Sequence, residues 1–169
     1  MNTINIQLDN IFKATSKSKI PTIEALTRLL ETHGALYKAY LYNNLENITE
    51  ETIDNLISLI SIACTIEKIT LNSIEDNANK GFIFGVNEVN TILKSNRTKL
   101  LNEYSVNIGI ISNFVQEYEK NKEQSSRDNV MDSINNAIYG LMYFLAYVSR
   151  DTISINNIIN EKISISLTE

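Results

Sequence analysis

The chain has 169 residues, a formal net charge of −5, one Cys and one Pro. A chain of this length can bury most of its apolar surface without disulfides, so we expect one compact body or two fused halves. The acidic balance and the absence of a Lys/Arg cluster argue against a nucleic-acid polymer as partner, because binding its backbone calls for a concentrated basic face. The single Cys64 lies in an apolar run, is expected to be a reduced core thiol, and favours a cytoplasmic protein.

Apolar residues at spacings of three and four predict helices along most of the chain, so the expected fold class is all-α. Thr22 is predicted to cap the second helix and Thr49 the third, where Glu50 and Glu51 in the first turn suit the helix dipole. Residues 82–86 are predicted to join two halves. Helices or helix-like segments are expected at residues 3–14, from 22 to about 42, from 49 onward, from 71 to about 81, and at 87–102, 103–120, 129–149 and 154–163.

Two features of these elements bear on membranes and on the core. The longest apolar run, residues 137–148, is shorter than the roughly 20 residues that a bilayer requires, and no signal peptide is visible, so no membrane partner is expected. The third and the 129–149 helices are apolar over much of their circumference and should be central. The residues expected to be buried are Leu56, Ile57, Ile60, Cys64, Ile138, Leu141 and Leu145.

The helical pattern occurs twice in the chain. Asp54 falls on Asn135 at an offset of 81 residues, Gly34 on Gly109 at 75, and the run from Ile69 on the run from Ile153 at 84. A repeat of about 80 residues is typical of a duplicated small domain. The sequence therefore predicts two copies, residues 1–84 and 85–169, packed as tandem helical repeats about an approximate two-fold axis.

Three carboxylates could form a metal site. Glu51 and Asp54 are three residues apart and project from one face of a helix, and antiparallel packing of the preceding helix could bring Glu31 near them. Carboxylates at close quarters repel each other unless a cation lies between them, and Mg²⁺ prefers such hard oxygen ligands. On spacing alone, solvated acidic faces are the more common explanation.

Three segments of the first half together resemble a known enzyme family. LLETHGALYKAY, EETIDNLISLISIA and ITLNSIEDNANK are similar to the MazG-like all-α nucleoside triphosphate pyrophosphohydrolases, whose pattern is E-E-x-x-E, then E-x-x-D, then a short helix. Here E-x-x-D is present as Glu51 to Asp54, whereas Thr32 and Ala35 stand where carboxylates are expected. The second copy retains only Asp132. The resemblance implies Mg²⁺-dependent cleavage of a nucleotide by water, with Glu31, Glu51 and Asp54 holding the metal in a partly eroded site.

Other residues are weaker candidates. Lys38, Asn77 and Lys80 could contact a substrate phosphate, although a surface role is the more common one for such residues. His33, the only His, is expected to be a packed, hydrogen-bonded side chain rather than a base. Three functions stay open: a pyrophosphohydrolase with one surviving site, a nucleotide-binding or sequestering protein without hydrolysis, and a helical interaction or assembly module, in each case with a possible homo-oligomer.

Overall fold

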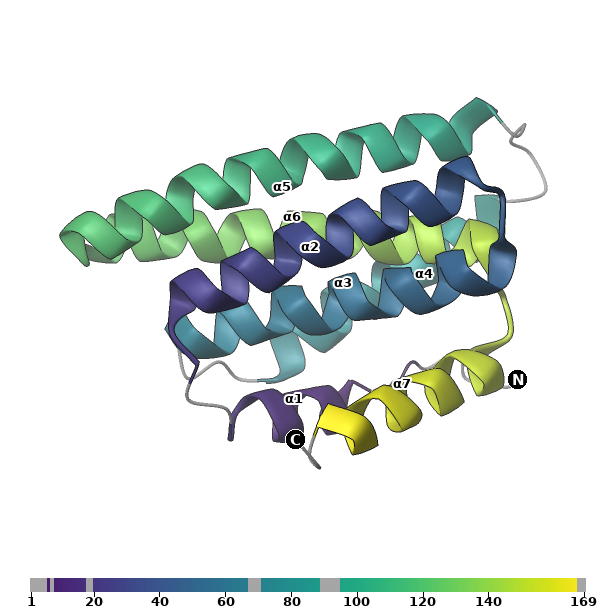
Figure 1. Cartoon of the computed structure of the whole chain (residues 1–169), viewed down its shortest axis with the longest axis horizontal. Coiled ribbons are helices and arrows are strands. Elements are labelled where there is room, and N and C mark those ends of the chain that lie inside the picture. Colours follow the sequence, from purple (N-terminus) through teal and green to yellow (C-terminus); the bar gives the residue numbers. More distant parts are fainter. Residues whose placement is uncertain (1–5, 7, 18–19, 67–70, 89–94, 167–169) are drawn as a thin grey trace.

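A computed structural model describes residues 6, 8–17, 20–66, 71–88 and 95–166 of the chain (Figure 1). Over these residues the secondary structure is entirely helical, which confirms the all-α prediction. None of the helices in this part of the chain is long and apolar enough to cross a membrane. The seven helices of the described residues are α1 (Asp9–Thr15), α2 (Thr22–Leu41), α3 (Leu45–Ile66), α4 (Leu71–Glu88), α5 (Ser95–Asn121), α6 (Gln124–Val148) and α7 (Thr152–Ser166).

Two helical hairpins form the centre of the molecule. α2 packs along α3, and α5 packs along α6, each pair running antiparallel through a short connection (Figure 1). α3 and α6 contact each other, α2 contacts α5, and α4 lies along α6. α1 and α7 lie side by side at one edge of the bundle, where both contact α3.

The two central helices are α3 and α6, as their composition predicts. Leu56 and Ile60 of α3 are buried, as are the three predicted positions on α6, Ile138, Leu141 and Leu145. Ile57 and Cys64 were expected in the same core, but both are only partly buried. α3 is therefore apolar on a side that the bundle does not cover completely.

Several helix boundaries differ from those the sequence predicts. α2 begins at Thr22 itself with Pro21 at the N-cap position, so Thr22 is not the cap. α3 begins at Leu45, and Thr49 lies buried inside it with its hydroxyl donating to the Leu45 carbonyl at 3.0 Å. The Thr49 hydroxyl therefore forms a hydrogen bond inside the helix and does not cap its N-terminus. A Thr hydroxyl can donate to the carbonyl four residues earlier as readily as it can accept from an N–H at a helix start.

The segment predicted to join the halves is helical. α4 runs without a break from Leu71 to Glu88, so residues 82–86 are part of it and Gly81 is not its end. A Cβ on Gly81 would meet the Tyr139 carbonyl oxygen at 2.5 Å, and one on Gly85 would meet the Ala146 Cβ at 2.7 Å. These glycines allow the backbone of α4 to approach α6, and packing overrides their low helix propensity.

The second half also contains fewer elements than predicted. α5 is one helix where two segments, 87–102 and 103–120, were expected, and residues 89–94 lie outside the described part. The gap predicted between residues 120 and 129 is mostly helical. α5 ends at Asn121 and α6 starts at Gln124, and Lys122 between them has a positive φ of 55°. The final helix, predicted at 154–163, is longer, because α7 runs from Thr152 to Ser166.

One buried polar contact joins the two hairpins. Asn55 on α3 is completely buried, and its amide donates to the carbonyls of Thr32 and Glu51, both at 2.8 Å. The hydroxyl of Tyr104, itself 1 % exposed, donates to the Asn55 side-chain oxygen at 2.9 Å. Since a buried amide without partners would be costly, this contact favours a single arrangement of α2, α3 and α5.

Candidate functional site

A cavity of about 450 Å³ lies where α1, α2, α3 and α7 meet. One part of its wall is apolar and includes Ile11, Ile57 and Ile163. The other part carries charged and hydroxyl side chains from α1, α2, α3 and α7. These polar residues are Thr15, Arg28, Glu31, Thr32, Asp54, Ser58, Ser61 and Lys162.

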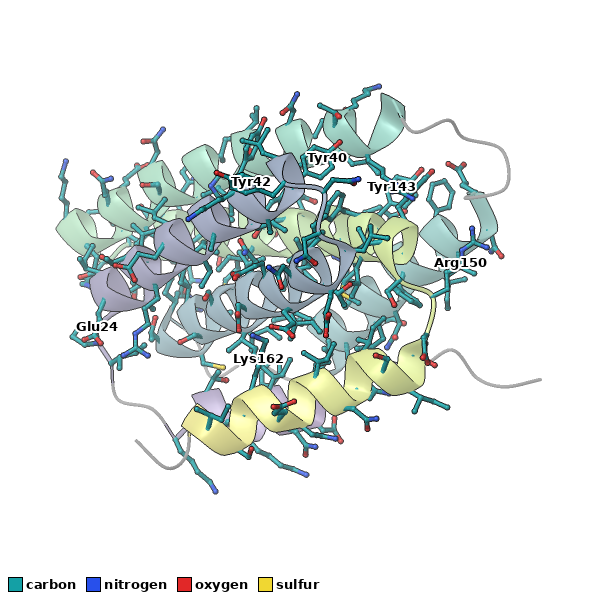
Figure 2. All side chains as sticks on the ribbon, turned by 45° about the vertical axis from the view of Figure 1, so that its right-hand side comes forward. Glu24, Tyr40, Tyr42, Tyr143, Arg150 and Lys162 are labelled. Atoms are coloured by element: carbon teal, nitrogen blue, oxygen red, sulfur yellow. The ribbon has the colours of Figure 1, made fainter. Side chains whose placement is uncertain are left out.

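An ion pair between α3 and α7 forms part of this wall. Nζ of Lys162 donates to Oδ2 of Asp54 at 2.7 Å, and the two side chains are only 21 % and 29 % exposed. Figure 2 shows Lys162 on α7 where this helix faces α3. Because both groups are partly withdrawn from water, this pair is screened less than the exposed pairs elsewhere on the molecule.

The three predicted metal ligands are only partly brought together. Glu31 and Asp54 line the cavity, with Glu31 exposed, whereas Glu51 lies half-buried outside its wall. Burial raises the pKa of the Glu51 carboxyl from its ordinary value of 4.5, the Asp54 carboxylate adds to the rise, and Lys162 opposes it. Among the described residues, no group of three or more His, Cys, Asp or Glu side chains is arranged to hold a metal ion.

These residues therefore do not present a fitting set of Mg²⁺ ligands in this arrangement. Asp54 already has a cation against it, and a divalent ion would have to displace the Lys162 ammonium to reach the carboxylate. Glu31, which lines the cavity from α2, is open to solvent. The Mg²⁺ site at Glu31, Glu51 and Asp54 stays a prediction.

Other polar groups of the cavity are engaged with their own helices or neighbours. Arg28 forms an ion pair with Glu24 one turn earlier, at 2.8 Å, with both side chains about half exposed or more. The Thr32 hydroxyl lies 3.1 Å from the Leu29 carbonyl and 3.4 Å from the Ser58 hydroxyl. These short hydroxyl-bearing side chains can rearrange toward a ligand, because each rotates about one bond.

Cys64 and His33 are both partly buried and each contacts a hydroxyl group on a neighbouring helix. The Cys64 thiol lies 3.4 Å from the Thr15 hydroxyl, and burial raises its pKa, so it is a poor nucleophile. Nε2 of His33 lies 2.9 Å from the Ser105 hydroxyl on α5, and burial lowers the pKa of the imidazole. The expectation of a hydrogen-bonded His33 is confirmed.

A second, open groove lies between the exposed edges of α4 and α6. It has a volume of about 480 Å³ and is lined by polar residues: Asp76, Asn77, Lys80, Asp132, Asn135 and Asn136. The Asn77 amide donates to the Asn135 carbonyl at 2.7 Å, and Lys80 pairs with Asp76 at 2.6 Å, with both side chains exposed. Asn77 and Lys80 thus line the same groove as Asp132 on α6 and not the cavity of Asp54. Lys38 is exposed and lines neither.

Sequence reasoning missed Lys162 and Arg28. Lys162 is 108 residues from Asp54 along the chain, so no local spacing connects them. One feature of the sequence does point to Lys162. It lies next to Ile163 in a stripe of buried isoleucines, Ile155, Ile159 and Ile163, and a Lys beside such a stripe is expected at the edge of a buried face. The partner across that edge cannot be read from periodicity.

Comparison with known proteins finds nothing similar: no family model, no curated protein and no solved structure matches the chain. The likeness to MazG-like enzymes therefore rests on the quoted residues alone.

Proposed function

We propose that the chain binds a small nucleotide-like molecule in the cavity between α1, α2, α3 and α7, and does not hydrolyse it. The observation that carries the proposal is the composition of the wall. A volume of about 450 Å³ falls in the range of ligand pockets, and apolar side chains face a smaller set of charged and hydroxyl groups. The apolar side suits a flat base, and Arg28 and the hydroxyls suit the sugar and phosphate.

Binding without hydrolysis follows from the charges. Metal-assisted cleavage of a phosphate needs carboxylates free to hold the cation. Asp54 is engaged by Lys162, and Thr32 and Ala35 replace two of the carboxylates that the MazG-like pattern expects. A Mg²⁺-dependent pyrophosphohydrolase is the alternative, and the same experiment separates the two.

The test is calorimetry against a panel of nucleoside mono-, di- and triphosphates, with and without Mg²⁺, beside an assay for released pyrophosphate. We expect heat of binding that does not require Mg²⁺ and no pyrophosphate. Ser61→Phe should fill the cavity and weaken binding at least about tenfold, whereas Asn136→Phe, in the polar groove, should leave it unchanged. If no nucleotide binds, or if Ser61→Phe binds as well as the wild type, the cavity is not a nucleotide site.

We also propose that the bundle arose by duplication and packs about an approximate two-fold axis. The contacts support this: α4 of the first copy packs on α6 of the second, and α7 of the second packs on α3 of the first. Buried positions of α4 and α7 recur at an offset of 81, rather than at the 84 expected from the runs that begin at Ile69 and Ile153. Ile74, Ala78 and Phe82 then correspond to Ile155, Ile159 and Ile163. Gly34 and Gly109 are equally open, with nothing within 4 Å of an added Cβ.

A second candidate function is a helical assembly module. We also propose a cytoplasmic location, which the single reduced Cys64 favours. Apolar side chains stay exposed on the two helices that His33 and Ser105 join: Leu30 on α2, and Val106 and Ile110 on α5, between 40 % and 63 % exposed. Light scattering after size exclusion tests this directly. Assembly would be supported by a dimer that Val106→Glu with Ile110→Glu converts to a monomer.

A further inference from the structure

We propose that Lys162 is a built-in counter-ion, which occupies the position beside Asp54 and Glu51 where a divalent cation would otherwise be held, so that the site is independent of metal. The inference concerns the cavity of the proposed function but does not require a nucleotide to bind there.

The first support is geometric. The ammonium of Lys162 lies 2.7 Å from the Asp54 carboxylate, and both side chains are mostly withdrawn from solvent. Glu51 lies one turn earlier on α3, where burial and the Asp54 carboxylate raise the pKa of its carboxyl and Lys162 opposes the rise. One cation therefore serves the E-x-x-D pair, which without it would place two negative charges together in a half-buried position.

The second support is the way α7 holds the lysine. Ile155 and Ile159 of α7 are fully buried, and Ile163, next to Lys162, is 8 % exposed. This apolar stripe fixes the helix against α1 and α3, so the ammonium is delivered to Asp54 from a docked helix rather than from a free surface chain. Because α7 is already docked, little further conformational entropy is lost when Lys162 pairs with Asp54.

The third support compares the contact of α7 with α3 and the contact of α4 with α6. Asn135 of α6 corresponds to Asp54 of α3 at the offset of 81, and the offsets of 81 and 84 place Gly81 and Ala78 of α4 where α7 has Lys162. Asp54 and Lys162 are therefore present together in the contact of α7 with α3, and both are replaced by uncharged residues in the contact of α4 with α6.

The experiment is a thermal unfolding series of the full chain with Mg²⁺ and with Mn²⁺, in the absence of nucleotide. The wild type should show no metal-dependent change in Tm. Lys162→Met removes the charge but keeps most of the volume, and its Tm should rise by about 2–5 °C on adding millimolar Mn²⁺. The double variant Asp54→Asn with Lys162→Met should lose that rise, and Lys80→Met should behave as wild type.

Two results would overturn the inference. One is a metal-dependent rise in the wild type that Asp54→Asn abolishes, because a metal would then bind beside the lysine. The other is a Lys162→Met protein that gains no metal response. If Lys162→Met is unfolded without metal, its helical circular dichroism is followed during a Mn²⁺ titration: recovery supports the inference, and its absence counts against it. Failure of nucleotide binding would affect neither measurement.

Discussion

The contact of α7 with α3 and the contact of α4 with α6 correspond to each other in the proposed duplication, but they are built differently. α4 carries Ala78, Gly81 and Gly85 toward α6, and its backbone touches that helix directly. α7 carries isoleucines at its buried positions and Lys162 beside them, and a cavity with an apolar wall is left next to α3. Gly81 and Gly85 let α4 approach α6 closely, whereas a cavity remains between α7 and α3.

This difference appears at Ile57 and Ile138, two isoleucines that are 81 residues apart in the chain. Ile138 is fully buried, whereas Ile57 lines the cavity and is only partly buried. The contact of α4 with α6 is therefore closed, and the contact of α7 with α3 borders a cavity.

The largest expected effect compares these two isoleucines. Ile138→Ala should lower the free energy of unfolding by about 2–5 kcal/mol, because it leaves a void in a closed core. Ile57→Ala should cost about 1–2 kcal/mol, because its side chain already borders open space. Urea unfolding of both variants measures the difference, and equal losses would mean that the cavity is filled in solution.

The next comparison concerns glycines. Gly81→Ala should destabilise the protein by about 1–3 kcal/mol, because the new methyl group would lie 2.5 Å from the Tyr139 carbonyl oxygen. Backbone atoms cannot rotate away, so α4 and α6 would have to move apart. Gly34→Ala, on an open surface, should instead stabilise it by about 0.5–1 kcal/mol through helix propensity. The same denaturant titration decides, and a stabilised Gly81→Ala protein would contradict close packing of α4 on α6.

A smaller effect separates the two lysines. Lys162→Met should cost about 1–2 kcal/mol without metal, between the values known for exposed and buried pairs, because Asp54 is left partly buried and alone. Lys80→Met, whose pair with Asp76 is about two-thirds exposed, should change the free energy by less than about 0.5 kcal/mol. Equal losses would show that the α3–α7 pair is no different from a surface pair.

The smallest effect distinguishes Glu51 on α3 from Asp132 on α6. The folded protein raises the pKa of Glu51, so stability is lost as pH rises from 4.5 through the folded pKa, and the ionised carboxylate is unfavourable at pH 7. Glu51→Gln should therefore raise Tm slightly at pH 7, and the gain should vanish below pH 4.5. Asp132→Asn, at an exposed position, should leave Tm unchanged at both pH values.

The sequence predicts which segments are helical better than it predicts where each helix begins and ends. Periodicity identifies α3 and α6 as central, because an apolar circumference needs cover on several sides. It cannot show that Thr49 bonds inside its helix, or that Gly81 and Gly85 continue α4 rather than end it, because tertiary contact decides between the two outcomes. Asp54 could be selected from its spacing with Glu51. Lys162 could not, since only the folded chain brings the two together.

The contacts of α4 with α6 and of α7 with α3 each join distant parts of the chain. Asp54 and Lys162 are 108 residues apart, and closing so long a loop costs entropy before the contact is gained. We therefore expect the contact of α7 with α3 to form late in folding and to open before the central core does.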